Sequence, residues 1–162
     1  MLEAGRRDFL DATREVSEER ALVRLHAGAW SVVECVEHVI QVEERYLGLL
    51  AEGGPSAVER DLRRELRLFT MIRSRLTPLA APGVFWPQGR FDSLTKAVAE
   101  FGLVRDRSVR MAEEYGEGIA GIGGKHPRFG DLNGAEFLQL IDGHARRHAE
   151  QIREMLGEEA EA

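Results

Sequence analysis

The sequence has little of what several protein classes require. Its single cysteine, Cys35, cannot form an intrachain disulfide, which excludes a disulfide-stabilised fold. Its only lysines, Lys96 and Lys125, do not follow a glycine-rich phosphate loop and leave few candidates for Schiff-base chemistry. No stretch approaches the roughly 18 uninterrupted apolar residues of a membrane span, and the N-terminal residues lack the apolar core of a signal peptide. These absences predict a cytoplasmic protein with no membrane partner.

The composition is that of an ordinary globular domain. Hydrophobic residues make up 43% of the 162 positions and charged residues 31%, which predicts one domain over residues 1–162. The net charge of −6 argues against a nucleic acid as the main partner. The only local basic excess is the arginine-rich stretch 56–77, which we interpret as a solvated helix face with intrahelical ion pairs.

Hydrophobic periodicity predicts an all-α protein. Helical periods are found in five segments and convincing strand alternation in none, and a glycine-dense stretch over 116–130 is expected to be a loop. The predicted helices cover residues 2–25, 31–52, 56–77, 92–115 and 134–156. Long amphipathic helices joined by loops of this size predict an up-and-down four-helix bundle with an additional helical segment at 56–77.

Two helix starts carry specific capping signals. Ser31 is followed three residues later by Glu34, which predicts a capping box in which each side chain accepts the other residue's backbone N–H. Asn133 and Glu136 repeat this spacing before the last predicted helix. We therefore expect well-defined helix starts near residues 31 and 133.

The last predicted helix carries two histidines on its apolar face. His144 and His148 are four residues apart, so their imidazoles lie on one side of the helix at the spacing that two ligands of one metal ion require. Gln151 lies on the same face one turn further on. The alternative is a pair of core histidines that hydrogen-bond to carbonyl groups, water or Gln151.

The second predicted helix offers further candidates. His38 lies at the edge of its apolar arc and could be a third metal ligand, or a half-buried histidine with ordinary hydrogen bonds. Glu43 falls inside the same arc. It could orient a metal ligand or accept a proton, or it could form an interhelical salt bridge to an arginine.

Two sequence elements resemble a known family. The stretch from Trp30 to His38 is similar to the W-S-x-x-E-x-x-x-H element of the DinB/YfiT-like superfamily, and the stretch from His144 to Ile152 is similar to its H-x-x-R-H-x-x-Q-I element. The likeness extends over nearly the whole chain. These DinB proteins are unrelated to the DNA polymerase that shares the name.

The resemblance implies a four-helix bundle in which His38, His144 and His148 hold one divalent metal ion, zinc or nickel in most relatives, and frequent homodimers. Three imidazoles leave a tetrahedral ion one open position, which is the pattern of a catalytic metal site. Members of the superfamily include S-transferases that use bacillithiol or mycothiol, and a mycothiol-dependent maleylpyruvate isomerase. The resemblance thus points to a metal-activated thiolate.

These observations predict a divalent-metal-dependent enzyme that transfers a low-molecular-weight thiol to a small-molecule substrate. Gln151 would position substrate or water, and Glu43 would orient a metal ligand or accept a proton. A metal-dependent hydrolase and a non-catalytic stress-response scaffold are the alternatives. Because metal ligation needs neutral imidazoles, activity is expected to fall as the pH drops through the ordinary histidine pKa of about 6.5.

Overall fold

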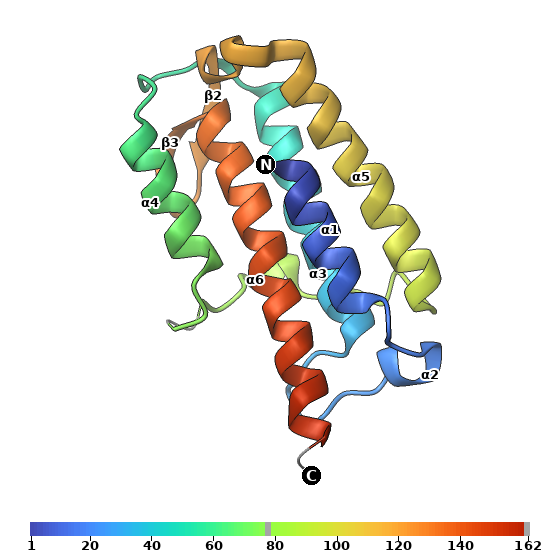
Figure 1. Ribbon diagram of the computed structural model, residues 1–162. Coiled ribbons are helices and arrows are strands. Elements are labelled where there is room, and N and C mark those ends of the chain that lie inside the picture. Colours follow the sequence, from blue (N-terminus) through green and yellow to red (C-terminus); the bar gives the residue numbers. More distant parts are fainter. Residues whose placement is uncertain (77–78, 161–162) are drawn as a thin grey trace.

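Four long helices form a bundle in the computed structural model, which describes residues 1–76 and 79–160 (Figure 1). The bundle consists of α1, α3, α5 and α6, and α4 packs against α6. In chain order the elements are α1 (Leu2–Thr13), α2 (Glu18–Ala21), α3 (Val32–Glu52), β1 (Gly54–Pro55), α4 (Leu62–Arg73), the 3₁₀ turn η1 (Gly83–Phe85), α5 (Leu94–Tyr115), the 3₁₀ turn η2 (Gly116–Gly121), β2 (Ile122–His126), β3 (Gly130–Asn133) and α6 (Gly134–Ala160). No helix of this described part is both long and apolar enough to span a membrane.

The helix directions show why α4 matters for the topology. Helices α1, α4 and α6 run one way and α3 and α5 the other, so consecutive long helices alternate in direction when α4 is counted (Figure 1). Within the bundle, α1 lies beside α6 and α3 beside α5, and each of these neighbouring pairs is parallel. The predicted four-helix bundle with an additional helix is thus confirmed, and α4 returns the chain to the end where α5 begins.

Both predicted capping signals are confirmed. The Ser31 hydroxyl accepts the backbone N–H of Glu34 at 3.3 Å, and the Glu34 carboxylate accepts the backbone N–H of Ser31 at 2.8 Å. Asn133 and Glu136 make the same reciprocal pair, with both distances 3.0 Å. These caps set where α3 and α6 begin, and therefore where their histidines lie along the bundle.

The predicted helix over residues 2–25 is divided in the structure. Helix α1 ends at Thr13, and Ser17 caps the separate short helix α2. The carboxylate of Glu18 in α2 accepts the backbone N–H groups of Leu94 and Thr95, at 2.6 and 2.9 Å. The break after α1 therefore places an acid at the start of α5, where free amides and the helix dipole favour negative charge.

The additional helix is shorter than its predicted range of 56–77. It begins at Leu62 because the preceding Asp61 accepts the backbone N–H groups of Arg63 and Arg64, at 2.8 and 3.3 Å. On its inner side α4 lies close to α6 at Gly143, where an added Cβ would stand 2.3 Å from a methyl carbon of Ile72. The missing side chain at Gly143 thus allows α4 to pack tightly beside the two histidines of α6.

A small antiparallel sheet replaces much of the loop predicted over 116–130. Strand β2 pairs with β3 from Gly123 opposite Asn133 to His126 opposite Gly130, and β1 adds a third strand. An added Cβ on Gly123 would lie 2.6 Å from the Leu132 carbonyl oxygen, so this close pairing needs glycine. The loop prediction was wrong here because glycines contribute no hydrophobic alternation by which a strand could be recognised.

The core consists of two hydrophobic clusters. Along α5, a buried ion pair separates the residues that belong to one cluster from those that pack against the other. One cluster includes Phe9 and Phe101, whose ring centroids are 4.6 Å apart, and the other includes Phe137. Burying each such ring stabilises the fold by roughly 1.5–3 kcal/mol. Arg105 follows the first cluster on α5, is fully buried, and pairs with Glu43 of α3.

Candidate metal centre

His38 comes from the middle of α3 and is held in place from two sides. The Trp30 ring, just before the helix, lies 4.8 Å from the His38 ring between centroids. His38 Nδ1 lies 2.8 Å from the carbonyl oxygen of Phe85 in η1. A carbonyl oxygen only accepts, so Nδ1 donates, and the neutral imidazole keeps its free lone pair on Nε2. His38 is therefore in the tautomer that can bind a metal through Nε2.

The helix α6 supplies the other two histidines, one turn apart. His144 and His148 are both buried, and Ala145 and Ala149 beside them are small enough for close helix packing. The Nε2 atoms of His148 and His144 lie 3.1 Å apart. The pair predicted from spacing thus projects from one face into the bundle.

The three imidazoles converge on one point. His38 Nε2 lies 3.2 Å from His144 Nε2, and one candidate ligand atom from each of the three residues lies within 4.8 Å of the other two. Nitrogen ligands about 2.0–2.1 Å from a tetrahedral metal ion stand about 3.3 Å apart. The donor set therefore fits a divalent metal ion, and His38, His144 and His148 form the only such group of histidine, cysteine or acidic side chains in residues 1–76 and 79–160.

The electrostatic environment favours neutral imidazoles. Burial lowers the pKa of all three histidines, and those of His144 and His148 fall well below the ordinary value. The charges of the other histidines and of nearby arginines lower the pKa of His144 and His148 further, with Arg147 acting on both. All three lone pairs are thus available to a metal at neutral pH.

The structure revises the pH range expected from the sequence: acid should release the metal, and lower the activity, only below the ordinary histidine pKa of about 6.5. Protons displace a metal as the pH approaches the pKa of its ligands, and all three ligands have a lowered pKa. We expect metal content to be retained after dialysis at about pH 6, where an unperturbed histidine with a pKa of about 6.5 is mostly protonated. Elemental analysis across a pH series measures this, and a midpoint near or above 6.5 would contradict it.

The candidate centre lies in the wall of a large cavity. The cavity has a volume of about 900 Å³ and is bounded by α3, α6, the segment 79–87 and the turn between β2 and β3. The acids among its lining residues are Glu34 and Glu154, and each is paired with an arginine of the same cavity, Arg24 and Arg75 respectively. The site thus has space for a small-molecule substrate next to the histidines and no carboxylate that lacks a basic partner.

The two other predicted site residues occupy different environments. Gln151 lines the cavity, raises the pKa of His148 slightly, and lies 3.5 Å from Arg75 through its side-chain oxygen. Glu43 lies outside the cavity lining and is almost fully buried. Its oxygens accept two hydrogen bonds from Arg105, both 2.8 Å, and one from the Ser108 hydroxyl at 2.6 Å. Both carboxylate oxygens are thus bound, which favours the interhelical salt bridge over a role in the site, the two alternatives that the sequence allowed for Glu43.

Glu37 is a residue that the sequence did not single out. It is fully buried, and its carboxylate accepts the backbone N–H groups of Gln88, Gly89 and Arg90 at 2.5 to 3.1 Å. These bonds anchor the same chain segment whose Phe85 carbonyl binds the neighbouring histidine. The available signal in the sequence was an acid directly before a candidate metal ligand. Its partners could not be predicted, because they are 51–53 residues away along the chain.

Removing this anchor should weaken metal binding. Glu37→Ala would free the 88–90 amides and loosen the carbonyl that orients His38. Loss of a group that orients a metal ligand typically lowers affinity about 10–100-fold. Competition with a chelator measures the affinity, Glu52→Ala at the exposed end of α3 is the control, and Glu37→Gln serves if the alanine variant fails to fold. An unchanged affinity in a folded variant would show that the segment does not support His38.

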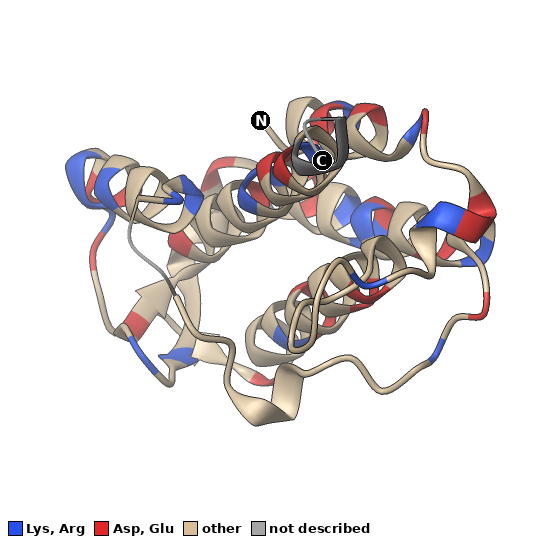
Figure 2. Cartoon of the chain, turned by 90° about the horizontal axis from the view of Figure 1, so that it is seen from below, with Lys and Arg blue, Asp and Glu red and all other residues tan. Residues whose placement is uncertain are grey.

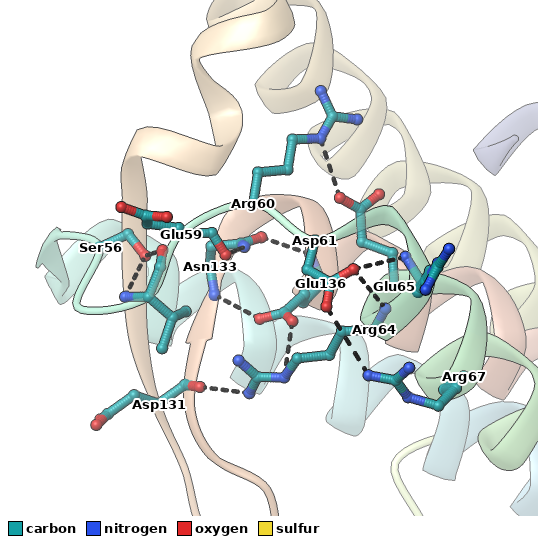
Figure 3. Close-up of polar contacts among 12 residues, drawn as sticks. Ser56, Glu59, Arg60, Asp61, Arg64, Glu65, Arg67, Asp131, Asn133 and Glu136 are labelled. Carbon is teal, nitrogen blue, oxygen red and sulfur yellow. Dashed lines mark hydrogen bonds and ion pairs between the residues drawn. The ribbon is translucent and has the colours of Figure 1, made fainter.

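Several arginines of the stretch 56–77 form ion pairs with acids. Arg60 pairs with Glu65 at 3.0 Å, and Arg64 pairs at 3.0 Å with Glu136 at the start of α6 (Figure 3). Viewed along the bundle, basic and acidic residues are interspersed on the helices (Figure 2). The stretch 56–77 was interpreted as a helix face with intrahelical ion pairs, whereas these two pairs join α4 to the segment before it and to α6.

Known proteins share this fold. A comparison with curated protein sequences found no match. TT2238, described as a four-helix bundle protein, has a TM-score of 0.59 and 21% identity, with 94% of this chain and 93% of that one covered. YfiT from Bacillus subtilis, described as a probable metal-dependent hydrolase with an unusual four-helix bundle topology, has a TM-score of 0.56 and 15% identity, with 96% and 83% covered. The sequence pattern of the DinB superfamily matches residues 1–152, and the chain therefore belongs to the DinB superfamily.

Proposed function

We propose that this protein is a divalent-metal-dependent enzyme whose ion is held by His38, His144 and His148. The observation that carries the proposal is the convergence of three imidazole groups, with Nε2 separations of 3.1 and 3.2 Å, in the wall of a cavity. Three nitrogen ligands suit zinc or nickel and leave one position open. A divalent ion in such a site supplies a Lewis acid that lowers the pKa of a thiol or water bound to it.

Transfer of a low-molecular-weight thiol is the reaction that the cavity supports best. Its 900 Å³ is near the upper end for small-molecule sites, enough for a thiol and an electrophile together. The thiol sulfur would form a bond to an electrophilic carbon while that carbon's bond to a leaving group, to an epoxide oxygen or to the second alkene carbon gives up its electron pair. The thiol proton would pass to solvent with a leaving group, or to the oxygen or carbon that received the electron pair. This needs no carboxylate base, and Glu34 and Glu154 are both paired with arginines. Gln151 would orient one of the two substrates.

Hydrolysis is the second candidate, and the description of YfiT as a probable metal-dependent hydrolase favours it. The two reactions differ in their nucleophile, which is a thiol in one and water in the other. A hydrolase with this cavity would need a proton acceptor other than its lining acids, because both of these are paired with arginines. Dependence of turnover on added thiol therefore separates the two.

The test combines metal analysis with turnover. Purified protein should contain close to one equivalent of zinc or nickel and should consume a small thiol with at least one of a panel of alkyl halides, epoxides and activated alkenes. Chelation should abolish turnover and leave the far-ultraviolet circular dichroism nearly unchanged, since both core clusters are built from helices without the metal. Metal-dependent cleavage of esters or amides without thiol would establish the hydrolase instead, and metal without either activity would favour the scaffold. The homodimer remains a prediction, which light scattering measures.

A further inference from the structure

The cavity contains a hydrogen-bond donor that takes no part in the metal site. His126, at the end of β2, accepts the backbone N–H groups of Arg128 and Phe129 at Nδ1, at 3.0 and 3.2 Å. The proton of the neutral ring is therefore on Nε2, which lies 3.0 Å from the Tyr46 hydroxyl. Tyr46 thus accepts from His126. Its own proton has no acceptor within residues 1–76 and 79–160, and both residues line the cavity.

The surroundings keep this donor protonated. Burial and the charge of Arg128 lower the pKa of His126 to about 4, so its ring is neutral at physiological pH. Burial also raises the pKa of Tyr46 far above neutrality. The residue Tyr46 as a whole is only 7% exposed, so an acceptor group of a ligand would bind its hydroxyl with little competition from water.

Two arginines flank this pair and have no acidic partner in the described chain. Arg45 directly precedes Tyr46 on α3, and Arg128 lies in the turn that follows His126. Both line the cavity with exposed side chains, unlike Arg24 and Arg75, which are paired with cavity acids. Two guanidinium groups without acidic partners and a free hydroxyl donor, all lining one cavity, are the groups that bind an oxyanion.

The rest of the cavity suits an apolar group. Trp30, Phe85, Phe129 and Met155 are among its lining residues.

We propose that the cavity binds small molecules that carry an oxyanion group on an apolar body, with the oxyanion held by Tyr46, Arg45 and Arg128. This rests on the proposed function in one respect: such a molecule would be the substrate or the thiol of that enzyme. The oxyanion is a carboxylate or a phosphate, which share this recognition chemistry.

Tryptophan fluorescence can test the proposal directly, because both tryptophans, Trp30 and Trp86, line the cavity. The probes are benzoate, phenyl phosphate and the neutral benzamide, titrated into both chelator-treated and metal-loaded protein. We expect saturable fluorescence changes with one or both anions, and benzamide binding at least about tenfold weaker. The preferred anion identifies the oxyanion as carboxylate or phosphate.

Matched variants locate the site. Arg45→Gln and Arg128→Gln should each weaken anion binding about tenfold, and Tyr46→Phe should weaken it several-fold, in the metal-free protein as well. Arg63→Gln removes an exposed arginine of α4 outside the cavity and should have no effect. Equal binding of benzamide, or anion binding that is unchanged in both arginine variants, would overturn the proposal.

The outcome is distinguishable from that of the enzyme assay. If the protein takes up no metal but the arginine variants lose anion binding, the proposed function fails and the oxyanion site stands. If anions bind only to metal-loaded protein and independently of Arg45 and Arg128, the metal is their ligand and the oxyanion site is wrong.

Discussion

Replacing His144 with alanine is expected to remove stoichiometric metal binding and all metal-dependent turnover. His144 is close to both other ligands, with its Nε2 3.2 Å from that of His38 and 3.1 Å from that of His148. Its loss leaves two nitrogen donors, too few for the three-ligand site that catalytic zinc requires. We expect metal affinity to fall by more than the roughly 100-fold that loss of a supporting hydrogen bond can cause. Elemental analysis after dialysis and chelator competition measure both quantities.

The chain offers a matched control for this experiment. His26 is exposed and does not belong to the three-histidine group, so His26→Ala should retain full metal content. His144→Ala should also remain folded, because burying a neutral imidazole beside two others contributes little once the metal is absent and an alanine fits an α-helix. Full metal content in folded His144→Ala would show that the ion binds elsewhere, and the three-histidine assignment would be wrong.

Periodicity was sufficient to predict the burial of three of the four buried histidines of the described chain, and it missed His126. In α3 and α6 the 3.6-residue period placed His38, His144 and His148 on apolar faces, and capping signals at Ser31 and Asn133 set where the helices begin. Their convergence depends on how α3 and α6 are rotated and shifted relative to each other. His38 and His144, which these helices carry, are 106 residues apart in the sequence. The hydrophobic pattern of the residues does not determine that arrangement. The family resemblance implied it, because in the family the three histidines hold one metal ion.

The parts that could not be predicted depend on long-range partners. The Phe85 carbonyl that orients His38 and the amides bound by Glu37 come from an irregular segment with no periodic pattern. The Tyr46 and His126 pair joins residues 80 positions apart, one of them in a strand that its glycines conceal. For Glu43 the sequence allowed two roles, and the choice between them required knowing that Arg105, 62 residues away, faces it.

The buried ion pair that decided this choice has a large expected effect on stability. Glu43→Ala leaves the guanidinium of Arg105, which is fully buried, without its carboxylate, and Ser108 without its acceptor. Breaking a buried pair in this way typically costs about 3–5 kcal/mol. We expect a loss of this size in the free energy of unfolding, measured by urea denaturation. The neighbouring Glu44 makes only partly exposed ion pairs, so Glu44→Ala should cost about 0–1 kcal/mol.

A double variant separates a structural role of Glu43 from a catalytic one. Glu43→Leu with Arg105→Met replaces both charges of the pair by apolar groups. Arg105 also lies 3.9 Å from the buried Asp142, which keeps its ion pair with Arg146 at 2.9 Å. The double variant should therefore be clearly more stable than Glu43→Ala. Metal content and turnover per folded molecule should equal those of the wild type, since Glu43 does not line the cavity and both its oxygens are bound by Arg105 and Ser108. If the stable double variant instead binds metal but loses turnover, Glu43 acts in the reaction, and the ion pair with Arg105 must open for it to do so.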